Sequence, residues 1–138
     1  REMMQLSSAI SLLEEKSARK PRKKSISART QEYKYATYME SWRQKVERIG
    51  NLNYPSQAKQ EKLYGDVLLA VAINANGTIY EIKVLKSSGK KVLDDAAIRI
   101  VRLAAPFAQL PKEILKDTDV LQIIRTWKFE SNNQLGSK

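Results

Sequence analysis

Few side chains in this sequence have the types and spacing that catalysis or metal binding requires. The chain contains no cysteine and no histidine, which excludes thiol nucleophiles, disulfides, the common zinc sites and Ser-His-Asp arrangements. Asp94 and Asp95 could form a carboxylate pair, but adjacent residues on a helix point about 100° apart, and no third ligand is evident. We interpret both as partners of a helix dipole, and we expect no catalytic residue, no metal and no cofactor.

Two short polar segments could be mistaken for phosphate-binding loops. Asn74-Ala75-Asn76-Gly77 and Ser87-Ser88-Gly89 are both short, and neither has the Gly-x-x-x-x-Gly-Lys spacing of a phosphate loop. We interpret the first as a tight turn and the second as a break between elements. The sequence therefore predicts a protein that acts by binding through its surface and is not an enzyme.

Positive charge is concentrated at the N-terminal end. The 138 residues carry a net charge of +10, and residues 1–30 hold eight basic against three acidic side chains, which favours acidic partners. No aromatic residue is interleaved with the basic run of residues 16–24 to stack on a base, so we interpret it as a solvated linker and expect no nucleic-acid partner. The alternative is a nucleic-acid or anionic-polymer binding module that uses residues 16–29. Separately from that alternative, the same basic stretch is a candidate for secondary contact with peptidoglycan.

The last apolar stretch, residues 119–129, predicts a strand with one buried face, because its side chains alternate with period 2. Residues 130–138 contain no further apolar run that could pair with this strand. We therefore expect its outer margin to be an open sheet edge, available to a partner strand or to a second copy of the chain. The residues expected on the buried face are Leu121, Ile123, Trp127 and Phe129.

Two segments have the period of an amphipathic helix. The first should begin at Thr30 as N-cap and end at Gly50, and a short helix should follow Pro55 as far as about Lys62. The second helix covers residues 92–104 and stops at Pro106. The apolar stripe of the first helix consists of Tyr35, Tyr38, Met39, Trp42, Val46 and Ile49, and that of the second of Val92, Leu93, Ala96, Ala97, Ile100, Val101 and Ala104.

Residues 65–74 and 78–86 alternate on either side of an Asn-Gly turn, which predicts a β-hairpin. A helical crossover then brings the last strand into the same sheet, antiparallel to the first strand of the hairpin. The expected fold is α+β with two layers, a three-stranded antiparallel sheet with helices on one face, preceded by an N-terminal helical and basic stalk. The apolar residues of the hairpin are Val67, Leu69, Val71 and Ile73, then Tyr80, Ile82 and Val84.

The chain divides into a stalk or linker (residues 1–30), a folded domain (31–130) and a flexible tail (131–138). Residues 2–17 have the spacing of a narrow amphipathic helix. Because the chain begins with Arg1 and has no apolar run of about 18 residues, we expect a fragment of a longer protein.

The same residues form an ordered series that covers residues 35–130. It consists of Asn53-Tyr54-Pro55, Gly65, the Asn76-Gly77 turn, Ser87-Ser88-Gly89, Leu93-Asp94-Asp95-Ala96-Ala97, Ala105-Pro106-Phe107 and Ile124-Arg125-Thr126-Trp127-Lys128-Phe129. The series resembles the C-terminal periplasmic domain of TonB-type energy transducers, in the proteobacterial form. A TolA-like envelope protein is the alternative, although TolA domains of the enterobacterial kind commonly carry a disulfide that this chain cannot form.

The resemblance implies a periplasmic domain, anchored in the inner membrane by an N-terminal helix that this sequence does not contain. In that family, the TonB box of an outer-membrane transporter adds as a strand beside the last strand, and an ExbB/ExbD motor supplies force from the proton gradient. The cargo could be iron bound to siderophores, haem, cobalamin or sugars. Gly50-Asn51-Leu52-Asn53 replaces the Gln-Pro-rich stretch of the enterobacterial members. By position, the resemblance assigns partner binding to Asn51, Leu52, Asn53, Tyr54, Pro55, Val120, Gln122, Ile124, Arg125, Thr126 and Lys128.

Overall fold

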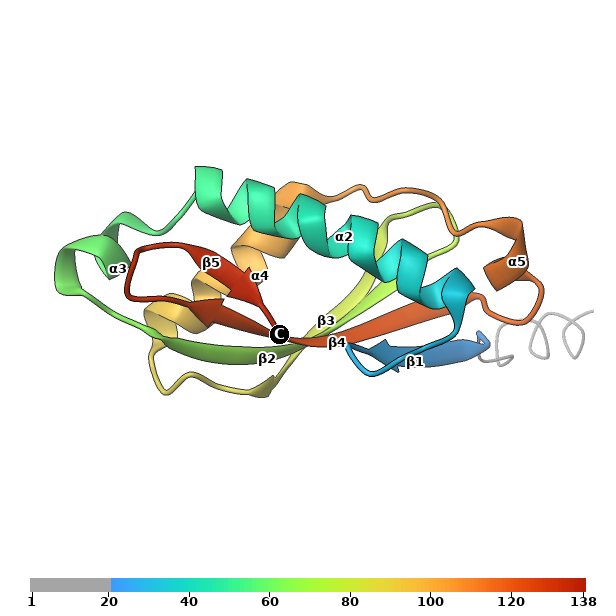
Figure 1. Cartoon of the computed structure of the whole chain (residues 1–138), viewed down its shortest axis with the longest axis horizontal. Coiled ribbons are helices and arrows are strands. Elements are labelled where there is room, and N and C mark those ends of the chain that lie inside the picture. The colour runs from blue at the N-terminus through green and yellow to red at the C-terminus, as the bar shows by residue number, and fades with distance from the viewer. Residues whose placement is uncertain (1–20) are drawn as a thin grey trace, which may run out of the picture.

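The computed structural model describes residues 21–138, and Figure 1 shows their arrangement. The helix expected over residues 2–17 lies outside the described residues. Within residues 21–138, no helix combines the length and the hydropathy that a membrane span needs. The strands are β1 (Lys23–Ser27), β2 (Gly65–Asn74), β3 (Ile79–Lys86), β4 (Val120–Phe129) and β5 (Leu135–Ser137), and the helices are α2 (Tyr33–Leu52), α3 (Ser56–Glu61), α4 (Lys91–Ala104) and α5 (Lys112–Leu115).

The antiparallel part of the sheet has the topology expected from the sequence. β2 pairs with β3, and it also pairs with β4 along its whole length, from Gly65 opposite Phe129 to Asn74 opposite Val120. The apolar faces of β2 and β4 are buried, as the alternation predicts. The expected position of the last strand beside the first strand of the hairpin is therefore confirmed.

The predicted three-stranded sheet is wrong in extent, because two short strands continue the sheet beyond β4. β1 pairs in parallel with the N-terminal half of β4, and β5 pairs antiparallel with its C-terminal end. Each contributes one large buried side chain, Ile26 or Leu135, which is too little for a detectable alternation. The fold is α+β with a five-stranded mixed sheet. β1 lies among the residues expected to form the stalk (1–30), and β5 lies among those expected to form the tail (131–138). Both strands belong to the sheet of the domain.

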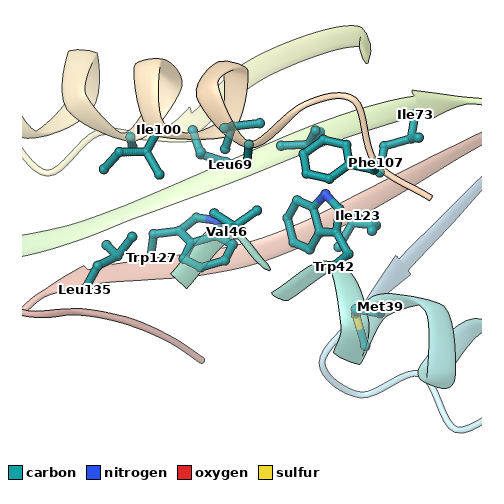
Figure 2. Packing of buried hydrophobic residues seen from close by; sticks show 14 of the residues in the cluster. Met39, Trp42, Val46, Leu69, Ile73, Ile100, Phe107, Ile123, Trp127 and Leu135 are labelled. Carbon is teal, nitrogen blue, oxygen red and sulfur yellow. The ribbon is translucent and has the colours of Figure 1, made fainter. Parts of the chain in front are cut away.

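One hydrophobic core fills the space between the sheet and the helices α2 and α4 (Figure 2). The rings of Trp42 in α2 and Trp127 in β4 meet edge to face, with 5.5 Å between centroids, and Trp42 also contacts Phe107 at 5.9 Å. Such geometry is favourable because the positive edge of one ring faces the negative face of the other. Figure 2 shows Ile100 of α4 directed toward Leu69 of β2. The core therefore fixes β4 from its covered face.

Helix α2 begins two residues later than expected. Its first residue is Tyr33, and Glu32 precedes it as the capping position. Thr30 closes a turn with the end of β1, because its N–H donates to the Ser27 carbonyl (2.9 Å) and its Oγ1 accepts from the Ser27 N–H (2.9 Å). Residues 28–31 thus form a compact connection between β1 and α2.

The expected apolar face of β3 is only partly confirmed. Tyr80 is 51% exposed, because an irregularity in the β2–β3 register next to Ala72 places Ile79, and not Tyr80, opposite Ile73. Val84 keeps its place opposite Leu69 but is exposed at the edge of the sheet. Sequence alternation could not reveal this shift of register.

Tyr38 gives the domain a pH dependence in alkali. Its hydroxyl donates to the Ala108 carbonyl (2.6 Å), and burial raises its pKa to about 12. An unfolded tyrosine ionises near pH 10. The stabilisation that buried, neutral Tyr38 gives to the folded state is therefore complete below about pH 10 and is lost as pH rises to about 12. We expect the free energy of unfolding to fall over this window less steeply in Tyr38→Phe than in the unchanged chain, as measured by urea unfolding at several pH values. Identical slopes would contradict this assignment.

Candidate functional site

The outer edge of β4, expected to be open, is occupied. β1 lies along Val120–Ile124, and β5 lies along Trp127–Phe129. Beyond β5, Lys138 and Thr126 exchange two backbone hydrogen bonds. The distance from Lys138 N to Thr126 O is 2.9 Å, and the distance from Thr126 N to Lys138 O is 3.4 Å. The prediction of an open edge is therefore wrong, and any added strand must first replace one that the chain itself supplies.

β1 is held on this edge by contacts at its two ends. The side chain of Ile26 enters the core and is 2% exposed. At the other end, the backbone N–H and the guanidinium of Arg22 donate to the Asp119 carboxylate (2.7 to 3.1 Å), and the guanidinium also reaches the carbonyls of Leu115 and Lys116. The hydrogen bond to Asp119 raises the pKa of Arg22. These groups are about half exposed, so water weakens the ion pair.

β5 is held by the side chain of Asn51 at the end of α2. The Asn51 Oδ1 accepts from the Leu135 N–H (2.8 Å), and its Nδ2 donates to the Leu135 carbonyl (3.4 Å). The amide thereby pairs with both backbone groups of one extended residue, as a neighbouring strand would. Asn51, which the resemblance assigned to partner binding, thus binds the outer side of β5, the strand that pairs with the end of β4.

Gly50 lets β5 approach α2. The sequence placed the end of the helix here, but α2 continues to Leu52. A Cβ on Gly50 would lie 2.4 Å from Cδ2 of Leu135 and 3.2 Å from Cγ2 of Ile100. This glycine therefore permits close packing in the last turn of α2 and does not terminate the helix.

Arg125 lies in the gap between β1 and β5 but points to the covered face of the sheet. It is 9% exposed, and its Nε donates to the Ser137 hydroxyl (2.7 Å). Burial and repulsion from Arg43 lower its pKa, against the attraction of Glu40 and Glu47. Its side chain contacts β5 from the covered face, and its backbone groups face β2, because those of the adjacent Thr126 face the outer edge.

The rest of the segment 51–55 divides between two places. The ring of Tyr54 packs on Phe129 at the end of β4, with 5.7 Å between centroids. Leu52, Asn53 and Pro55 instead line a groove of about 920 Å³ that faces α4. The structure therefore brings Asn51 to β5 and Tyr54 to the end of β4, and it places Leu52, Asn53 and Pro55 on a neighbouring surface. The remaining lining of the groove is Tyr54, Ser56, Gln57, Lys91, Val92, Asp95, Ala96 and Arg99.

The other predicted site residues lie along β4, on the face opposite to the core side chains. Val120 is buried, whereas Gln122, Ile124, Thr126 and Lys128 are partly exposed. Gln122 accepts a hydrogen bond from the Ser25 hydroxyl of β1 (3.0 Å). Their backbone groups, not their side chains, form the edge that β1 and β5 occupy.

The acidic pair does not converge on a common site. Asp94 lies in the first turn of α4, as the helix-dipole interpretation requires, and accepts hydrogen bonds from the Ser87 hydroxyl and from Ser88. Burial opposes its ionisation, but these hydrogen bonds together outweigh burial and lower the pKa of Asp94. Asp95 faces the groove beside α3. Residues 21–138 contain no cluster of three or more side chains suited to a metal ion.

Comparison with known proteins assigns the family. The family model described as "Gram-negative bacterial TonB protein C-terminal" matches residues 50–131, which is more than half of the chain. The chain belongs to the TonB C-terminal family. Members of the family are energy-transducing proteins of transport and not enzymes, and the TonB C-terminal domain is periplasmic. The match favours this family over the TolA-like alternative.

Relatives of the TonB family align with parts of this chain. Protein TonB of Helicobacter pylori is 37% identical over 60 residues, which is 44% of this chain and 21% of that protein. Protein TonB of Pasteurella multocida is 30% identical over 83 residues, 60% of this chain and 32% of that protein. The chain therefore spans between a fifth and a third of these relatives.

An NMR structure of the Helicobacter pylori TonB C-terminal domain has the same fold. It superposes with a TM-score of 0.54 at 24% identity, over 68% of this chain and 80% of that one. The likeness confirms the α+β architecture inferred from the TonB-type resemblance.

The sequence reasoning missed Ile26, Leu135 and Ser137, which secure the two short strands. Ile26 is a lone apolar residue between two serines, inside a basic stretch that suggested a linker. A weak signal for β5 was present, since Asn133 adopts a positive φ of 60° in the turn that returns the chain to β4, and an Asn-Asn pair favours such hairpin turns.

Proposed function

We propose that this chain is the transporter-binding module of a TonB-type energy transducer. It binds the TonB box of an outer-membrane transporter as an added strand on β4 and passes on force from an ExbB/ExbD motor, which drives active uptake. An inner-membrane anchor upstream of Arg1 would connect the module to the motor. The family match supports this proposal, and the contacts of β5 give it a structural basis.

One observation carries the proposal: β5 occupies the edge of β4 as an added peptide strand would. It is only three residues long, it pairs through backbone groups, and Asn51 pairs with both backbone groups of Leu135. Backbone pairing depends little on side-chain identity, so a peptide that displaces β5 can inherit the same partners. An edge-strand homodimer through β4 would need the same displacement.

The predicted binding residues take distinct roles in this proposal. Thr126 and Lys128 offer backbone groups to the peptide, while the backbone groups of Arg125 face β2 and its side chain lies under the edge. The amide of Asn51 binds the peptide backbone, and the ring of Tyr54 packs on Phe129. Val120, Gln122 and Ile124 form the other half of the edge, under β1. The groove beside α4 that Leu52, Asn53 and Pro55 line is available to transporter residues outside the box.

The alternative of a nucleic-acid binder loses part of its basis in the structure. It relied on residues 16–29, but Lys23–Ser27 are a strand of the sheet. Peptidoglycan as a secondary partner of the basic N-terminal stretch stays a prediction. A steep loss of affinity with salt would be its signature.

An NMR titration of the full chain with a synthetic TonB-box peptide from a transporter of the same organism tests the proposal. We expect shifts of backbone amides in residues 119–129 and 51–55, together with faster hydrogen exchange at Leu135–Ser137 as β5 leaves. The absence of shifts along β4 at saturating peptide would contradict the docking model.

A reversible disulfide tests whether β5 must leave. Lys128 and Gly136 are directly opposite in the β4–β5 pair, and a Cβ on Gly136 meets only the flexible Glu130 carboxylate. In the variant Lys128→Cys/Gly136→Cys, we expect the oxidised chain to bind the labelled peptide at least about tenfold more weakly than the reduced chain, because backbone hydrogen bonds to β4 are blocked. Fluorescence anisotropy measures both forms, and equal affinities would show that β5 is not displaced.

A further inference from the structure

β1 covers the half of the β4 edge that β5 leaves free, and it runs parallel to β4. We propose that β1 is a releasable strand, whose departure lengthens the peptide-docking edge from Arg125–Phe129 to the whole of Val120–Phe129. This inference rests on the proposed function. It adds a second state, in which the module holds a longer peptide segment.

The contacts of β1 suit a strand that can leave. Only Ile26 is buried, whereas the lysine and serine side chains of β1 are exposed or partly exposed. The ion pair just before β1, between Arg22 and Asp119, and the ion pair between Lys24 of β1 and Glu32 both have side chains that are 44% or more exposed, where such pairs contribute little. Parallel pairing is also slightly weaker per residue than antiparallel pairing. By contrast, β2 on the other side of β4 pairs over ten residues with both strands buried.

Release of β1 can stay local. The backbone of Glu32 accepts the first hydrogen bonds of α2 from Tyr35 and Ala36, so the helix keeps its own start when the turn at Ser27–Thr30 opens. Most of the rest of the core is supplied by α2, α4, β2 and β4, with further residues from α3, α5, β5 and the segment before α5. Only the site of Ile26, opposite Ile123 in the register, is uncovered, and an apolar peptide side chain of similar size can fill it.

A second disulfide tests the inference in the full chain. Ser25 and Gln122 are register partners with side-chain oxygens 3.0 Å apart, and paired strands lie about 4.8 Å apart, within the range of a disulfide. The chain has no cysteine of its own, so Ser25→Cys/Gln122→Cys forms one defined bridge that locks β1 on β4. Circular dichroism of the oxidised and reduced forms checks that both stay folded.

Two synthetic TonB-box peptides serve as probes. One has about five residues and matches half of the β4 edge, and the other has about ten residues and matches the whole edge. We expect oxidation to weaken binding of the long peptide by about tenfold and to leave binding of the short peptide unchanged. Equal affinity of both forms for the long peptide would overturn the inference. If the reduced form binds neither peptide, the proposed function fails along with it.

The variant Ile26→Ser weakens the attachment of β1 without a disulfide. Its expected effect on affinity for the long peptide is opposite to that of oxidation. We expect it to bind the long peptide several-fold more tightly than the unchanged chain, because less is lost when β1 leaves. If Ile26 only stabilised the fold, the variant would bind each peptide as tightly as the unchanged chain does, or more weakly. Unchanged or weaker binding of the long peptide would therefore also overturn the inference.

Discussion

Replacement of Gly77 by alanine should lower the free energy of unfolding by at least about 3 kcal/mol. Gly77 has a φ of +88°, and a Cβ there would lie 2.0 Å from the Phe107 carbonyl oxygen and 2.8 Å from its carbon. The clash is with backbone, which cannot rotate away. The clash lies where the β2–β3 turn is hydrogen-bonded to the segment before α5. The Phe107 N–H donates to the Gly77 carbonyl (2.8 Å), and the Leu110 N–H donates to the Ala75 carbonyl (2.9 Å).

Gly89→Ala is a matched control for this prediction. Gly89 has a φ of +83°, and a Cβ there meets nothing within 4 Å, so its replacement isolates the cost of the left-handed backbone, about 1 kcal/mol. Urea unfolding of the two variants measures the difference. Equal destabilisation would mean that the contact with Phe107 contributes nothing beyond backbone strain.

Trp127→Ala should be about as damaging, with an expected loss of about 3–5 kcal/mol. Trp127 is 1% exposed and is the largest fully buried side chain in residues 21–138. Its removal leaves a cavity beside Trp42, whose ring it contacts edge to face, and the fixed sheet and helix cannot close around the gap. We also expect weaker protection of the β5 amides, because Trp127 is the register partner of Ser137.

Leu103→Ala is the comparison for Trp127→Ala, because Leu103 is a large apolar residue that is 52% exposed on α4. Its truncation should change stability by no more than about 0.5 kcal/mol. Urea unfolding measures the global effect, and hydrogen exchange measures the protection of β5. A small loss in Trp127→Ala would indicate that the core repacks around the missing indole.

The long elements were predictable because each repeats its pattern over many residues. The buried residues of α4 and the alternation of β4 follow from periodicity alone, and the hairpin is marked by its turn. β1 gave no such pattern and β5 only a weak turn signal, since each strand depends on one side chain whose burial is decided by tertiary contact with residues about 85 to 100 positions away. The open edge inferred from composition was therefore wrong.

The candidate site was predicted in part for the same reason. Tyr54 packs on Phe129 at the end of β4, and Asn51 pairs with Leu135 of β5, while their role in partner binding stays a prediction. Arg125 was assigned to the edge, but its odd-numbered position in the strand turns its side chain to the covered face. Leu52, Asn53 and Pro55 face α4 because the chain turns at the end of α2, which position in the sequence cannot reveal.

The full-length pairing of β4 with β2 has a mechanical consequence. A load that enters through a peptide on the outer edge of β4 and runs along the strand meets all the β2–β4 hydrogen bonds in shear, because these bonds lie perpendicular to the strands. In that direction they must break together, whereas a pull across the sheet would unzip them one pair at a time. The strand to which the peptide would attach is thus the one best able to carry tension into the domain.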